Sequence, residues 1–216
     1  ALCRFASAAA QAGDLAAARA PLAELRFIED PRWPPQRLLW GTEAAQVHAR
    51  LRGDAAETLR LSRRLVALDR ARGGDAAIAL GNLIDHELAA GDAEAATRTG
   101  AALVAALSCT RHEYSLAFAR LNLCAAWLAL DDAAQARAVA ALAWPQALRF
   151  ELQHCAAVYL ALLAALERRP RCAAALIGYA QARYAERDEV LEANEAKALQ
   201  RARALVEAQA GTAPPG

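Results

Sequence analysis

Asp85, His86 and Glu87 are the residues of this sequence whose types and spacing come closest to a catalytic group, because an imidazole stands between two carboxylates. Acid–base catalysis would also need a pocket and a shifted pKa, and on a helix such residues commonly form a solvated face. The sequence contains no motif for a phosphate loop, a dinucleotide site, a zinc protease or a nucleophile elbow. We therefore predict that the chain is not an enzyme.

Cysteine and histidine occur together twice, as Cys109 with His112 and as His154 beside Cys155. A structural zinc ion needs about four ligands in convergent pairs, and two weak pairs far apart in the chain rarely meet. We expect no metal and no cofactor. The five cysteines are an odd number without a CxxC pair, which favours a reducing cytoplasm over a disulfide framework.

A set of polar residues recurs at an offset of 40 and forms our candidate contacts to a ligand or partner. On one predicted helix they stand at positions i, i+3 and i+4, which share a face. The alternative is that these residues cover the outer surface or bond between neighbouring repeats. The candidates are Gln46, Asn82, Asp85, His86, Arg120 and Asn122.

A Gly-Asp step between Ala-rich runs sets the spacing of the whole chain. It occurs as Gly13-Asp14, Gly53-Asp54 and Gly91-Asp92, then in altered form as Asp131-Asp132 and near Pro170, at intervals of 38 to 40 residues. A repeat of this length is typical of a helical solenoid built from helix-turn-helix units. We expect the glycine to adopt the left-handed conformation after one helix and the aspartate to cap the next.

These turns predict an all-α fold, a right-handed α-solenoid of about five helix-turn-helix repeats with a C-terminal capping helix. Residues 1–210 would form one domain, and residues 211–216 a disordered tail. Pro21 should kink or shorten its helix, and Pro145 should begin the fifth pair. The expected helices cover residues 1–12 and 15–27, 36–51 and 55–72, 76–90 and 93–107, 111–130 and 133–143, 145–167 and 171–185, and 192–209.

Composition excludes several classes of partner. The formal net charge is +1, from 25 basic and 24 acidic residues that are spread along the chain. Binding to nucleic acid needs a concentrated basic face, so we expect no direct contact with DNA or RNA. No apolar run reaches the length of about 18 residues that a membrane span needs, so we expect no membrane partner either.

Leu80-Gly81-Asn82, followed by Gly91-Asp92 and then Ala96, resembles the tetratricopeptide repeat. The first helix is about one turn longer here, which explains a period of 38 to 40 residues in place of 34. The resemblance implies that the first helix of each unit lines a concave groove. A protein, a peptide or a small effector would bind there. The chain could also form a homo-oligomer.

The C-terminal fifth is similar to the end of large bacterial transcriptional regulators. The similarity rests on residues 173–180, on Asn194-Glu195-Ala196 and on residues 202–205. Such proteins join a DNA-binding domain and a signal-transduction ATPase to tetratricopeptide-like repeats. The resemblance implies that this chain is the sensor and scaffold part of a longer protein, consistent with the absence of methionine. A stand-alone adaptor that assembles protein complexes is the alternative, and an enzyme with a helical active site is the third class.

Overall fold

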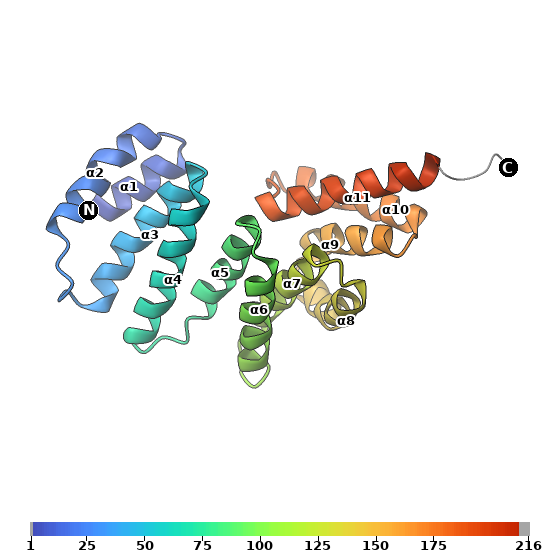
Figure 1. Cartoon of the computed structure of the whole chain (residues 1–216), viewed down its shortest axis with the longest axis horizontal. Helices are drawn as coiled ribbons and strands as arrows, with labels where there is room; N and C mark the ends of the chain where they lie inside the picture. Colours follow the sequence, from blue (N-terminus) through green and yellow to red (C-terminus); the bar gives the residue numbers. More distant parts are fainter. Residues whose placement is uncertain (1, 212–216) are drawn as a thin grey trace. The chain divides into compact units, whose positions relative to one another are not determined.

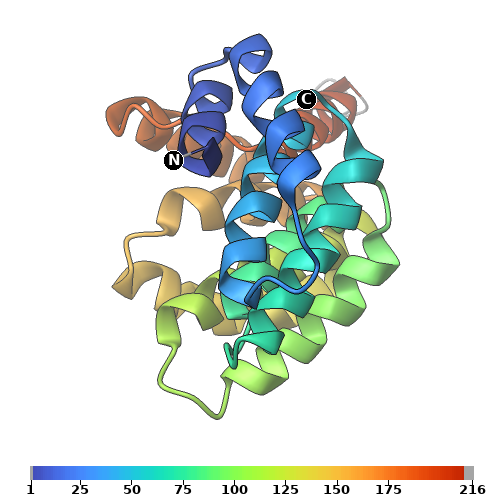
Figure 2. The same ribbon diagram turned by 90° about the vertical axis from the view of Figure 1, so that its left-hand side faces the viewer.

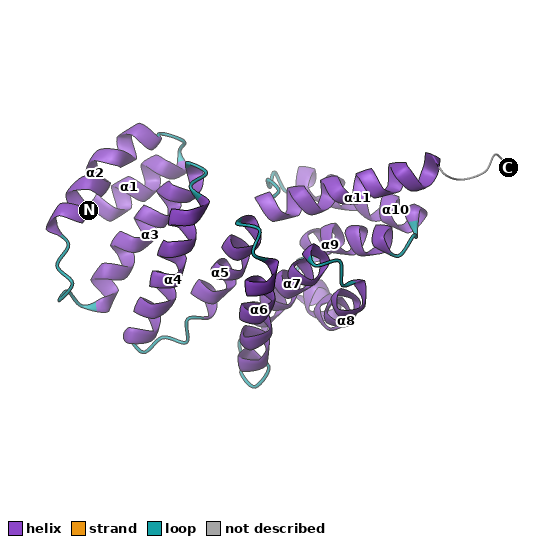
Figure 3. Cartoon of the chain, viewed as in Figure 1, coloured by secondary structure: helices purple, strands orange, loops and turns teal. Residues whose placement is uncertain are grey.

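The computed structural model describes residues 2–211, and it folds them into helices without a strand (Figure 3). Within each unit, most helices are joined by short turns. Residues 212–216, most of the expected tail, lie outside the described residues, whereas Gly211 ends the last helix. The helices are α1 Leu2–Gln11, α2 Leu15–Ile28, α3 Pro35–Leu51, α4 Ala55–Ala71, α5 Ala77–Ala89, α6 Ala93–Leu107, α7 Glu113–Ala129, α8 Ala133–Arg149, α9 Gln153–Leu166, α10 Pro170–Glu186 and α11 Ala193–Gly211.

The helices group into two compact units, residues 1–90 and residues 91–216. In unit 1, α1 packs on α2 and α3, α3 on α4, and α4 on α5. Figures 1 and 2 show α3 and α4 side by side as an antiparallel hairpin. In unit 2, α7 packs on α6 and α8, and α9 packs on α8, α10 and α11. The boundary between the units falls inside the Gly91-Asp92 turn.

The repeated turn has the predicted construction. Gly13, Gly53 and Gly91 have φ angles of +82°, +73° and +85°, and Asp131 takes the same left-handed conformation at +61°. The aspartate that follows each of these four residues accepts a hydrogen bond from the backbone N–H three residues later, at 2.8 to 3.1 Å. The predictions for the glycine and for the aspartate cap are therefore confirmed.

The prediction that Pro145 begins a helix is wrong. Of the two effects expected of Pro21, the shortening does not occur, and the kink stays a prediction. Pro145 lies inside α8, which continues to Arg149, and Pro21 lies inside α2, which continues to Ile28. A proline inside a helix removes one backbone hydrogen bond. Near Pro145, Arg120 of α7 donates to the carbonyl oxygen of Leu142 at 3.2 Å, which supports α8 at this position. The chain turns at Glu151 instead, a left-handed residue that carries no glycine signal.

Helices α6 and α7 approach each other closely at Gly100. A Cβ atom at this position would lie 3.1 Å from Cδ1 and 3.3 Å from Cβ of Leu123. Gly178 in α10 is the natural comparison, because a Cβ atom there would meet nothing within 4 Å. Close packing between α6 and α7 thus explains why position 100 is a glycine, whereas packing does not explain Gly178.

We predict that Gly53→Val destabilises unit 1 by about 1 to 2 kcal/mol, because a β-branched residue is strained in the left-handed conformation. Gly53→Asn is the matched control, since asparagine tolerates that conformation and should lose much less. Urea unfolding followed by circular dichroism measures both variants. A valine variant with the wild-type midpoint would contradict the structure of this turn.

Two glycine-to-alanine variants should change the free energy of unfolding by amounts that differ in sign or size. Gly178→Ala should raise the free energy of unfolding by about 0.5 to 1 kcal/mol, because alanine has the higher helix propensity. At Gly100→Ala the same gain is offset, because Leu123 must move away from the new Cβ atom. Equal stabilisation by the two variants in urea titrations would show that α6 and α7 are not in close contact at Gly100.

Candidate functional site

The sequence-predicted residues Gln46 and His86 meet in a polar cluster of unit 1, between α3, α4 and α5. Ser62, on α4, is the third member. Its Oγ lies 2.8 Å from His86 Nδ1, and Gln46 Nε2 lies 3.1 Å from His86 Nε2. Ser62 is 1% exposed and Gln46 is 7% exposed, so the cluster is part of the interior of the unit.

The hydrogen bonds of the cluster define the protonation state of His86. The tautomer of His86 with its proton on Nδ1 fits the cluster, because Ser62 can then donate to the carbonyl oxygen of Thr58 at 2.7 Å while its own oxygen accepts from Nδ1. His86 Nε2 is then the unprotonated nitrogen, which accepts from the Gln46 amide. The neutral ring thus satisfies every bond, whereas a second proton would face the amide donor of Gln46.

Burial favours the same neutral form. Burial, together with the smaller effect of the positive charge of Arg50, lowers the pKa of His86 to about 4. A serine–histidine pair that performs nucleophilic catalysis needs the hydroxyl to donate to the imidazole. With the proton on Nδ1 the imidazole instead donates to the hydroxyl, and with Ser62 1% exposed the arrangement is that of a structural link between three helices.

Of the other four predicted residues, two lie on α5 with His86 and two lie on α7 in unit 2. Asn82 is exposed on α5, and Asp85 is half-buried on the same helix. In unit 2, Arg120 bonds to α8 through Leu142 and through Gln146 Oε1, at 2.8 Å to the latter. Asn122 is buried two residues further along α7, a spacing that turns its side chain to nearly the opposite side of the helix from Arg120. Their role as partner contacts stays a prediction.

A second polar cluster joins α9, α10 and α11 in unit 2. The Tyr184 hydroxyl donates to Glu195 Oε1 at 2.7 Å, and the Glu192 backbone N–H donates to Glu195 Oε2 at 2.9 Å. His154 Nε2 lies 2.9 Å from a Glu189 oxygen. Burial raises the pKa of the Cys155 thiol to about 12, so this thiol stays protonated and weakly nucleophilic at neutral pH.

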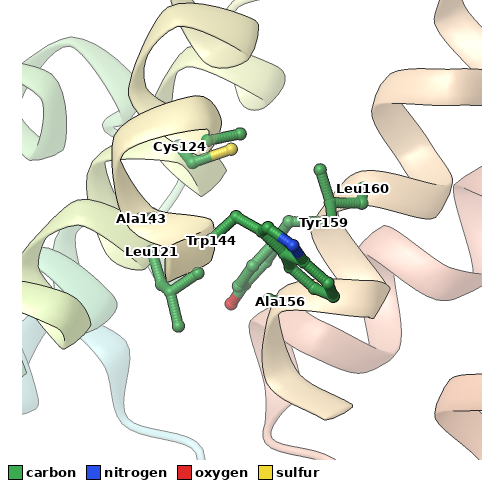
Figure 4. Close-up of a pocket in the computed structure, with 8 residues that line it drawn as sticks. Leu121, Cys124, Ala143, Trp144, Ala156, Tyr159 and Leu160 are labelled. Carbon is green, nitrogen blue, oxygen red and sulfur yellow. The ribbon is translucent and has the colours of Figure 1, made fainter. Parts of the chain in front are cut away.

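Unit 2 also contains a small apolar hollow, drawn in Figure 4. Trp144 of α8 extends across it toward Ala156 and Leu160 of α9, as expected for a large side chain that fills a gap left by alanines. Cys124 in its wall is 1% exposed, and burial raises its pKa to about 12. The hollow offers a ligand little beyond apolar contact. Its lining residues are Leu121, Cys124, Ala140, Ala143, Trp144, Ala156, Tyr159 and Leu160.

The hollow of unit 1 has a different character, and sequence reasoning missed it. It lies between α2, α3 and α4, with an apolar floor and three arginines with one glutamate around it. The available signals were Arg60 and Arg64 one turn apart, and Gly41 in the interior of a predicted helix. The lining residues are Leu22, Leu25, Arg26, Glu29, Gly41, Thr42, Ala45, Arg60, Leu61 and Arg64.

Within residues 2–211, no group of three or more His, Cys, Asp or Glu side chains is placed to hold a metal ion. Over the same residues, no helix combines the length and the apolar character that crossing a membrane requires. No protein-family model, curated protein or solved structure matches the chain.

The depressed pKa of His86 predicts a specific loss of stability in acid. Between pH 6.5 and pH 4 the unfolded chain binds a proton that folded His86 does not, so the free energy of unfolding falls as the pH falls through this window. Above pH 6.5 the residue contributes no slope. We expect a loss on the order of 1 to 2 kcal/mol by pH 4.5, allowing for the part of the ring that water reaches.

Urea unfolding of the wild type and of His86→Gln, at pH 7 and at pH 4.5, isolates this contribution from that of the carboxylates. The variant should lose less stability between the two pH values than the wild type does. His112→Gln, which removes an exposed histidine of unit 2, is the matched control. Equal losses in the wild type and in His86→Gln would show that His86 is protonated normally in the folded chain.

Proposed function

We propose that this chain is a non-enzymatic helical-repeat domain that senses an effector or holds a protein partner within a bacterial transcriptional regulator. In this proposal the helix pairs form a right-handed α-solenoid of about five tetratricopeptide-like repeats, with α11 as the cap. The confirmed Gly-Asp turns support the repeat, since the turn recurs with the same construction at intervals of 38 to 40 residues. The domain would act in the cytoplasm without touching DNA itself.

The observation that supports the non-enzymatic part is the burial of Ser62 beside His86. This pair resembles a nucleophile with its base, yet Ser62 is only 1% exposed, so a substrate could not reach its hydroxyl without opening the packing of α3, α4 and α5. The thiols of Cys124 and Cys155 are held protonated by burial. Side chains with these properties are suited to holding helices together, and the exposed surface is left for binding.

The resemblance of residues 173–180, 194–196 and 202–205 to regulator C-termini favours a transcriptional role over the alternative, a stand-alone adaptor. The complete reading frame around this segment separates the two proposals. A phosphate loop together with a helix-turn-helix or winged-helix region would support the regulator. A frame without either would support the adaptor.

The proposal predicts binding without turnover. The purified chain should not hydrolyse ATP or p-nitrophenyl acetate and should not shift a DNA duplex in a gel. It should gain thermal stability with one member of a panel of small metabolites and peptides, because a ligand that binds the folded state raises its midpoint. Asn82→Ala and Asp85→Ala should reduce that gain without changing the helical signal.

The matched control for the catalytic alternative is Ser62→Ala. Ester hydrolysis by the wild type that disappears in Ser62→Ala and in His86→Gln would contradict the proposal. A panel ligand whose stabilising effect is insensitive to the α5 variants would move the binding site away from the predicted groove.

A further inference from the structure

We draw no further inference here: the strongest candidate, the exposed apolar face of α8 around Leu142, Pro145 and Leu148 in unit 2, carries none because nothing in the structure shows what covers it.

Discussion

The fold depends on one residue that ends one helix and begins the next. In the turn at Gly53-Asp54, the backbone N–H of Asp54 bonds to the carbonyl oxygen of Ala49 at 3.0 Å, and its carboxylate accepts from the N–H of Glu57. The first bond closes α3 and the second opens α4. The backbone groups at the end of α3 and at the start of α4 thus find their hydrogen-bond partners within this short turn. The chain reverses direction there, and the two helices pack on each other. Asp14 and Asp132 act in the same way.

Because alanine supplies most of the core, single contacts between helices are small, and polar links supplement them. His86 joins α3, α4 and α5, the Tyr184–Glu195 bond joins α10 and α11, and Arg120 joins α7 to α8. A buried hydrogen bond has a fixed direction, whereas alanine contacts tolerate sliding. Links of this kind therefore define which residues of neighbouring helices stand opposite each other, and Gly100 defines how closely α6 and α7 approach.

The helices and their turns could be predicted because glycine and aspartate carry their conformational preference locally. The error at Pro145 has the opposite cause: the real turn uses Glu151, an exposed residue with no preference for the left-handed conformation, and the backbone bond from Leu152 N–H to the Ala147 carbonyl oxygen, at 2.8 Å, closes it. The 40-residue offset correctly paired Gln46 with His86, since both lie on first helices. Ser62 and the arginine hollow were missed because they lie largely on second helices, whose register against the first is a tertiary property.

Two groups of polar side chains in unit 1 differ in what they contribute to the fold. Around His86 the bonds lie in the interior, where Ser62 is 1% exposed and Gln46 is 7% exposed. Around the hollow between α2, α3 and α4, Arg26, Arg60 and Arg64 form ion pairs with Glu57 and Glu29 near the surface. Exposed ion pairs contribute about 1 kcal/mol or less, because water and salt screen them. A buried polar group that loses its partner costs more, because no water replaces the lost bond. The cluster around His86 therefore constrains how α3, α4 and α5 pack, whereas the ion pairs around the hollow can rearrange at little cost.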